Sequence, residues 1–247
     1  MSNKIHLFWM YPDILNLHGD RGNIQAFEYV AGCMGLELEV TKIVNPDDVI
    51  DFEKADIMVF GPGELKACRI IANALEARKA QFEEYIHAQK HILVIGTSGA
   101  IFAKQIERLV EEDFDGLGLL EVTAKERKMI LGDDLHVQLS DGTELMGSQI
   151  QMADYTVDSQ YVLAQILYGH GNRAAGDEGA RRENLIWTNL LGPVMVKNPW
   201  WAAQMLAQAA QRKGMSYTMP ENSVFELELA SLEAIKEYIE LKKNRKD

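Results

Sequence analysis

The sequence predicts an α/β protein with a doubly wound, mostly parallel sheet and helices on both faces. Three observations lead to this fold class. Short apolar runs such as 56–60 and 92–95 alternate with longer amphipathic stretches from the start of the chain. These runs have no polar face, which is typical of parallel strands covered by helices. Glycines follow both runs, at Gly61 and Gly96, so the two loops are expected to share one crevice at the carboxyl edge of the sheet.

The first half of the chain is expected to alternate between strand and helix. Apolar or alternating runs predict strands at 4–9, 37–43, 56–60 and 92–95. Helical spacing predicts a helix at 22–35, one long amphipathic helix at 64–89 and a helix that starts at Ile101.

From about Gly116 the pattern changes to shorter strands and polar turns, which indicates an antiparallel extension of the same sheet. These strands are expected at 119–123, 135–139, 144–151 and 161–168, and a last strand follows at 183–189. A helix over 198–214 starts with Asn198-Pro199, a pair typical of a helix N-terminus. We therefore expect one domain at 1–214 and a C-terminal extension at 215–247, with one helix near 230–245.

Composition limits the class of protein. Hydrophobic residues make up 47% and charged residues 25% of the chain, as in ordinary globular proteins. The net charge of −12 argues against nucleic acid as a partner, and no apolar run reaches the roughly 18 residues of a transmembrane helix. The two cysteines suggest a reducing, cytoplasmic setting, and the Cys and His spacing predicts neither a metal site nor a cofactor. The basic cluster 242–246 is expected to be a solvated helix end.

The most suggestive loop for chemistry is Gly96-Thr97-Ser98-Gly99-Ala100, between a buried strand and a helix. Small residues around a hydroxyl at such a turn are typical of a nucleophile elbow. Ser98 needs a base to act as a nucleophile, and the two histidines that follow it, His136 and His170, lack a triad context. The alternative is that Ser98 caps the next helix.

Gly61-Pro62-Gly63 offers backbone N–H groups at a second strand end. Together with the N–H of Gly99 they could form an oxyanion hole or an anion site. The alternative is a plain turn between a strand and a helix.

Taken together, these loops resemble the class I (triad) glutamine amidotransferases of the cobyric acid synthase-like group, and within it the GatD-type glutaminase subunits. The most specific segment resembles the pattern Y-P-D-x-x-N-x-x-G-D-R-G-N, through Tyr11, Asp13, Asn16, Gly19, Asp20, Arg21 and Asn23. Gly61-Pro62-Gly63-Glu64 matches the oxyanion loop, and 169–172, 188–193 and 197–199 match later loops. The resemblance covers roughly residues 4–212 and implies a flavodoxin-like amidotransferase fold.

In that family an elbow cysteine attacks the amide of glutamine and a histidine activates it. A GatD-type subunit passes the released ammonia to a Mur-ligase-like partner, MurT, which amidates the peptidoglycan stem peptide of lipid II. Here the cysteine position holds Ser98 and the histidine position holds Leu191. The resemblance places a basic residue that helps to hold glutamine at Arg127 or Lys128, and the histidine of another family turn at Gln151.

Loss of both the thiol and its base predicts loss of glutaminase activity, because a serine needs the base more than a cysteine does. The main hypothesis is a binding or scaffolding subunit in a heterodimer with a MurT-like ligase, with glutamine as a possible ligand. Two alternatives stay open: a working glutaminase subunit, and a serine hydrolase that uses Ser98. Two apolar features either pack on their own domain or contact the partner. One is the pair Trp200-Trp201, and the other is a helical stripe of Leu229, Leu232, Ile235 and Ile239.

Overall fold

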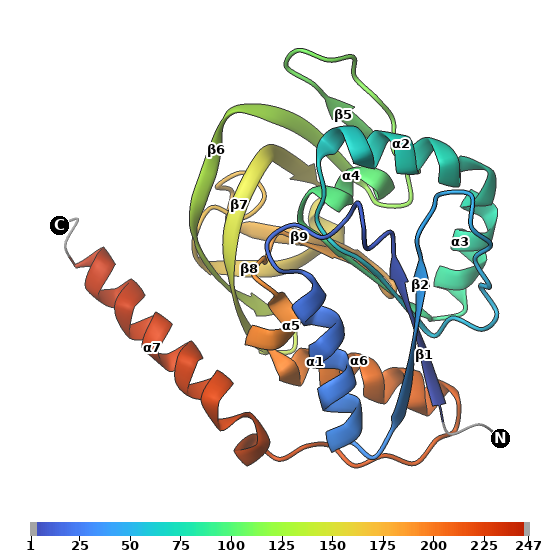
Figure 1. The fold of residues 1–247 in the computed structure, drawn as a ribbon. Coiled ribbons are helices and arrows are strands. Elements are labelled where there is room, and N and C mark those ends of the chain that lie inside the picture. The colour runs from blue at the N-terminus through green and yellow to red at the C-terminus, as the bar shows by residue number, and fades with distance from the viewer. Residues whose placement is uncertain (1–3, 245–247) are drawn as a thin grey trace.

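The computed structural model describes residues 4–244, in which ten strands form one mixed sheet with helices on both faces (Figure 1). The first three and last three residues lie outside this description, among them Arg245 and Lys246 of the expected basic cluster. The predicted α/β class is confirmed.

One half of the sheet is parallel and holds the strand ends that form the crevice. In spatial order its strands are β2 (Glu37–Ile43), β1 (Lys4–Met10), β3 (Ile57–Phe60), β4 (His91–Ile95) and β10 (Leu185–Thr188). Val94 of β4 pairs with Phe60 on one side and with Trp187 on the other. The loops after β3, β4 and β10 therefore leave the sheet at the same edge.

The other half of the sheet is largely antiparallel. It continues from β10 through β9 (Asp177–Arg182), β8 (Val162–Tyr168) and β6 (Val122–Leu139). The strand β6 also forms a long hairpin with β7 (Glu144–Val157) and pairs in parallel with the short β5 (Gln105–Glu107).

Helices bury both faces of the parallel half. One face packs against α1 (Arg21–Cys33) and α6 (Pro199–Arg212), and the other against α2 (Leu65–Leu75), α3 (Lys79–His87) and α4 (Gly99–Phe102). Within β3, Ile57 and Val59 belong to the first core, whereas Met58 and Phe60 belong to the second. Burial on both sides explains why this strand is apolar throughout.

The single helix expected at 64–89 is wrong, because the chain turns between α2 and α3. A 3₁₀ turn at Glu76–Arg78 separates them, and Arg78 there donates to the carbonyl of Pro46 at 2.9 Å. Leu75 and Phe82 are both fully buried on the two sides of the turn. Because the apolar face continues from α2 into α3, the hydrophobic pattern did not predict the turn between them.

The helix expected from Ile101 is only the single turn α4. Its carbonyls accept hydrogen bonds from a later segment, with Leu117 N–H donating to Ile101 at 2.7 Å and Leu119 and Leu120 N–H donating to Phe102. Ala103 is extended and ends the helix. A long-range backbone contact thus replaces the continuation that the local pattern predicted.

The antiparallel half differs from expectation in three strands. The strands expected at 119–123 and 135–139 are parts of one strand, β6, and β5 and β9 were not predicted. The stretch between the two expected strands contains many charges, and its middle, residues 128–130, is exposed where the pairing of β6 with β7 shifts register. A strand segment that is exposed on both faces needs no alternation of apolar and polar residues. The hydrophobic pattern therefore could not predict this part of β6.

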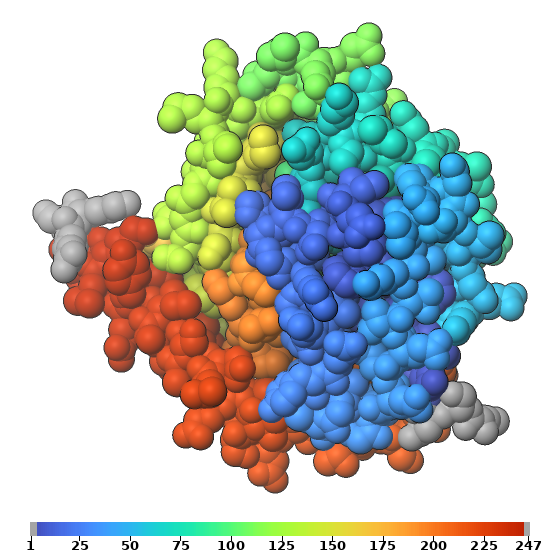
Figure 2. All heavy atoms as spheres, viewed as in Figure 1, coloured from blue at the N-terminus to red at the C-terminus, as the bar shows by residue number. Residues whose placement is uncertain are grey.

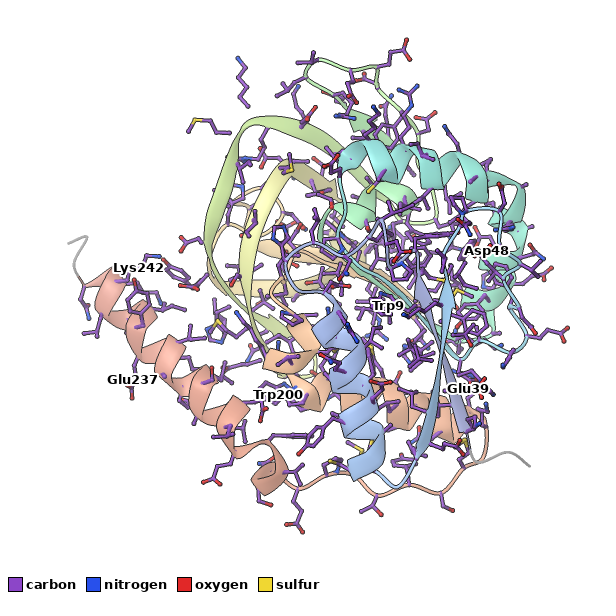
Figure 3. The ribbon with its side chains drawn as sticks, viewed as in Figure 1. Trp9, Glu39, Asp48, Trp200, Glu237 and Lys242 are labelled. Carbon is purple, nitrogen blue, oxygen red and sulfur yellow. The ribbon has the colours of Figure 1, made fainter. Side chains whose placement is uncertain are left out.

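The last helix, α7 (Glu226–Lys243), crosses the β6–β7 hairpin as a separate arm (Figure 1). Leu232 and Ile239 are buried with Met146 of β7, and Ile235 and Trp200 pack beside them. Figure 3 shows Trp200 between α7 and the rest of the domain. Two ion pairs add to this packing: Lys236 to Glu144 at 2.5 Å and Lys242 to Asp133 at 2.6 Å. The predicted stripe therefore packs on its own chain. Among residues 4–244, no helix is both long and apolar enough to cross a membrane.

Removing the buried end of the stripe should loosen α7 without unfolding the domain. We expect Ile239→Ala to cost about 2 kcal/mol of local stability, because Ile239 is only 2% exposed. Amide hydrogen exchange in α7 should then be faster by a factor of about 30. The control is Leu241→Ala, since Leu241 is 59% exposed on the same helix. Equal exchange rates in the two variants would contradict the assigned packing.

Candidate functional site

A crevice of about 410 Å³ opens at the carboxyl edge of the sheet. Its walls come from the loops after β1 and β3, the turn after β4, the segment after β10 and the middle of the β6–β7 hairpin; they include Leu17, Pro62, Gly63, Thr97, Ile150 and Leu191. Figure 2 shows this hollow where the yellow atoms of β7 lie between the lime atoms of β6 and the blue and cyan loops. The crevice therefore lies where ligands bind in open α/β sheets.

Ser98 lies at the predicted strand-to-helix turn, but its hydroxyl faces inward. Gly96 has a positive φ of +59°, which forms the turn, while Ser98 has an ordinary helical φ of −65°. The side chain is fully buried, and Oγ donates a hydrogen bond to the carbonyl of Gly61. The helix-cap interpretation is wrong, because Ser98 makes no side-chain cap bond.

Leu191 lies beside this turn and lines the crevice. A Cβ atom at Gly96 would lie 2.9 Å from Leu191 Cδ2 and 3.2 Å from Pro62 Cβ. Backbone hydrogen bonds of 2.8 and 3.0 Å with Ser148 of β7 fix the position of Leu191. The position of the family histidine thus holds an aliphatic side chain next to the elbow.

Neither histidine that follows Ser98 in the chain lines the crevice. His136 lies 3.0 Å from Glu144 near α7, and His170 lies 3.2 Å from Asp154. Among residues 99–244 no histidine reaches the crevice. His18, which precedes Ser98 in the chain, does line it, but the hydroxyl of Ser98 bonds to the Gly61 carbonyl instead.

Two of the N–H groups proposed for an oxyanion hole, those of Gly63 and Gly99, already have partners. The N–H of Gly63 donates to Thr97 Oγ1 at 3.1 Å, and Thr97 Oγ1 donates to the carbonyl of Gly63 at 2.5 Å. The N–H of Gly99 bonds to the carbonyls of Gly96 and Thr97 within its own turn, and Pro62 has no N–H. In this arrangement the loop is a closed turn, the second of the two interpretations that the sequence allowed.

Two residues of the segment 11–23 hold the edge of the crevice together from inside. Asp20 is 2% exposed and accepts a hydrogen bond from Asn23 Nδ2 at 2.6 Å. Its other oxygen has no partner and lies so close to Gly61 that a Cβ atom there would overlap it. Asn23 Oδ1 in turn accepts the N–H of Met195 at 2.8 Å. Burial raises the pKa of Asp20 to about 7, against the opposing effect of the Asn23 hydrogen bond.

The other residues of the family pattern in this segment shape the loop rather than the crevice, whereas Leu17 and His18, which lie between them in the chain, line the crevice. Tyr11 is fully buried with a positive φ of +54°, and burial raises the pKa of its hydroxyl to about 12. Asn16 accepts the N–H of Arg21 at 3.2 Å, and Gly19 has a φ of +78°. Asp13 and the Arg21 side chain are exposed to solvent.

The residues expected to hold glutamine lie outside the crevice lining. Arg127 pairs with Asp154, and Lys128 is exposed. Gln151 is buried on the opposite face of β7, where it donates to the carbonyl of Asn172 at 2.9 Å and is bonded to Gln149. The alternation of side chains along a strand separates Gln151 from Ile150 and Met152, which do line the crevice.

Sequence reasoning missed two buried ionic groups near the site. Arg108 lines the crevice, with only 8% of its side-chain surface exposed, and pairs with Glu126 through Nε at 2.9 Å. Glu178 is fully buried beside the end of β10, where it accepts hydrogen bonds from Thr188 at 2.7 Å and from the N–H of Asn189 at 2.6 Å. Burial raises the pKa of Glu178. Both residues come from short strands or loops rich in charges, where sequence gives no sign of burial.

The described residues contain no group of three or more His, Cys, Asp or Glu side chains that could hold a metal ion. Cys68 is buried beneath the elbow, with its Sγ 3.5 Å from the carbonyl of Thr97. Burial raises the pKa of this thiol to about 12, so it stays protonated and unreactive at neutral pH.

The chain is similar to two curated glutaminase subunits. It is 27% identical to the GatD subunit of the glutamine-hydrolysing lipid II isoglutaminyl synthase of Streptococcus pneumoniae, over 97% of this chain and 92% of that protein. It is 24% identical to the GatD subunit of Staphylococcus aureus, over 89% of this chain and 90% of that protein. No protein-family model matches the sequence.

Solved structures agree on the fold. A glutamine amidotransferase crystal structure superposes with a TM-score of 0.53 at 15% identity, covering 85% of this chain and all of that one. The PurLQS structure from Thermotoga maritima gives a TM-score of 0.50 at 15% identity, covering 76% of this chain and 86% of that one.

The buried carboxyl of Asp20 should make the stability of the protein depend on pH. Its pKa of about 7 in the folded state lies above the ordinary value of 3.8, so folding takes up a proton between these values. The free energy of unfolding should therefore fall as pH rises from about 4 to about 7, and Asp20→Asn should remove this contribution, on the order of 4 kcal/mol at most. Urea unfolding of both proteins at pH 5 and pH 8 measures the difference. Asp13→Asn, in the exposed part of the same loop, is the control; an equal effect there would refute the assignment.

Proposed function

Since the chain is a GatD-like class I glutamine amidotransferase in its sequence and fold, we propose that it has lost glutaminase activity and serves as a binding or scaffolding subunit. The observation that carries this proposal is the elbow itself. The hydroxyl of Ser98 is buried and bonded to the Gly61 carbonyl, while Leu191 occupies the neighbouring position that a base would need. A serine without a base cannot be deprotonated for attack at neutral pH.

The oxyanion side of the site supports the same proposal. Stabilising a tetrahedral intermediate requires N–H groups that are free to reach the developing negative charge. Here the N–H of Gly63 donates to Thr97 Oγ1, and the N–H of Gly99 donates to carbonyls within the elbow turn. Glutamine hydrolysis would need both loops to open, in addition to a new base.

For the partner, we propose a MurT-like Mur ligase, in the context of peptidoglycan amidation in the cytoplasm. The support is that both curated relatives are named as subunits of lipid II isoglutaminyl synthase. The Trp pair and the α7 stripe do not add to this support. Trp201 is 3% exposed in the core, and Trp200 donates to the carbonyl of Glu144 at 3.2 Å, so both are engaged within the chain.

The purified protein should release no ammonia from glutamine above the background of a buffer control. Ser98→Cys alone should add little, because the thiol still lacks a base. Ser98→Cys combined with Leu191→His should give measurable turnover, with Leu191→His alone as the matched control. An enzyme-coupled ammonia assay provides the readout. Robust turnover by the unmodified chain would refute the loss of activity, and labelling of Ser98 by a fluorophosphonate would indicate a serine hydrolase instead.

The subunit role predicts a stable complex. Co-expression with a MurT-like ligase from the same organism should yield a heterodimer that elutes as one peak in size-exclusion chromatography, with light scattering giving the mass of one copy of each. The Ser98→Cys variant should form the same complex, because the elbow is buried. If the chain elutes alone in the presence of the ligase, the scaffolding role is wrong.

A further inference from the structure

A serine and a lysine meet at the edge of the crevice, away from the elbow. Lys197, at the end of α5 (Val194–Lys197), has its Nζ 3.2 Å from the Oγ of Ser148 on β7. Both residues are half-buried, so molecules in solvent can reach them. The proposed function gives neither side chain a role.

Strand pairing places Ser148 in line with the crevice wall. Ser148 and Leu191 exchange two backbone hydrogen bonds, of 2.8 and 3.0 Å, so their side chains lie on the same face of this pairing. Leu191 lines the crevice, and so does Ile150, which lies two positions along β7 from Ser148 and on the same face of the strand. The serine and the lysine therefore continue the wall of the crevice beyond Leu191.

Lys197 has the surroundings of a lysine that can act as a base. Burial lowers the pKa of its amine below the ordinary value of 10.5. The negative charge of Asp134, which pairs with Ser148 across the β6–β7 hairpin, opposes this effect without reversing it. A neutral amine within hydrogen-bond distance of a serine hydroxyl is the base in the serine–lysine variants of the catalytic triad.

The turn at Gly192 supplies a hydrogen-bond donor next to this pair. A Cβ atom at Gly192 would lie 3.7 Å from Ser148 Oγ and 4.0 Å from Lys197 Nζ. The N–H of Gly192 has no hydrogen-bond partner among residues 4–244. Unlike the N–H groups of Gly63 and Gly99, it is therefore available to a negatively charged oxygen that forms beside Ser148.

From this juxtaposition we propose that Ser148 and Lys197 form a nucleophile–base pair that hydrolyses carboxylic esters with a small apolar acyl group. The acyl chain lies on the Leu191 and Ile150 side, where apolar contact favours it. The inference goes beyond the proposed function, because it uses no group of the elbow and needs no hydrolysis of glutamine.

The reaction needs only the ester and water. The neutral amine of Lys197 takes the proton of the Ser148 hydroxyl while Oγ attacks the ester carbonyl, and the Gly192 N–H stabilises the negative oxygen. The bond to the alcohol oxygen then breaks, and the Lys197 ammonium gives its proton to the leaving alkoxide. Water attacks the acyl-serine in the same way, so that the acid leaves and Ser148 is restored.

The test measures two properties of the full-length protein: the serine that a fluorophosphonate labels, located by peptide mass spectrometry, and the rate of 4-nitrophenyl butyrate hydrolysis. We expect labelling of Ser148 and a rate that rises with pH to a half-maximum below pH 10.5, because the base must be neutral. Ser148→Ala and Lys197→Arg should each lower labelling of position 148 and hydrolysis by about tenfold or more, since arginine keeps the charge but cannot act as a base. Ser159→Ala and Lys243→Arg, at exposed positions, are the matched controls.

The variant Ser148→Cys keeps the test decisive if Lys197→Arg fails to fold. Its thiol should react with iodoacetamide with an apparent pKa below the ordinary value of about 8.5, because Lys197 stabilises the thiolate, whereas Ser159→Cys should show the ordinary value. An ordinary pKa in both variants, hydrolysis unchanged in Lys197→Arg, or labelling of Ser98 in place of Ser148 would overturn the assignment. The ammonia assay is independent of these readouts. If they fail while glutamine still releases no ammonia, only the serine–lysine site is wrong.

Discussion

A buried contact between Asp20 and Gly61 holds the carboxyl edge of the sheet together. Asp20 fills the space that any side chain at position 61 would need, and Asn23 carries the connection on to the N–H of Met195. Three segments far apart in the sequence are thereby fixed around one crevice. The arrangement keeps a carboxyl group 2% exposed with one oxygen unpaired, which is costly. Packing beneath the crevice thus explains the sequence pattern around Gly19 and Asp20, which had predicted a functional loop. Asp13 and Arg21 of the same loop are exposed to solvent on its outer side.

The turn at Gly96 has the backbone geometry of a nucleophile elbow, whereas the hydroxyl on it is bonded within the protein. The backbone turn at Gly96 keeps its positive φ, and Trp187 Nε1 supports it by donating to the Gly96 carbonyl at 2.8 Å. The side chains around that turn face inward or are aliphatic. Ser98 donates to the Gly61 carbonyl, Thr97 is bonded to Gly63, and Leu191 lies beside Gly96. Polar groups that are bonded within the protein add to its stability, but they are not available to a substrate.

The sequence predicted the parallel half of the sheet well, because its strands are buried on both faces and leave short, unbroken apolar runs such as 92–95. It predicted the meeting of the Gly61 and Gly96 loops for a topological reason, since parallel neighbours end at the same edge. It failed where long-range contacts decide the outcome: α4 ends because residues 117–120 take its carbonyls, and β6 runs through a charged stretch that pairs with β7. The family resemblance placed a basic residue at Arg127 or Lys128 by its order along the chain, but Arg127 pairs with Asp154 outside the crevice lining. Arg108, from the loop after β5, lines the crevice instead.

The outer wall of the crevice depends on α7. The hairpin that provides Ile150 and Met152 is held by α7 through the ion pair of Lys236 with Glu144 and that of Lys242 with Asp133; the second pair joins positions 109 residues apart in sequence. Because α7 follows the hairpin along the chain, this wall gains its outer support only when residues 226–243 have been made. At a synthesis rate of roughly 5–20 residues per second, the interval between the hairpin and its support is several seconds.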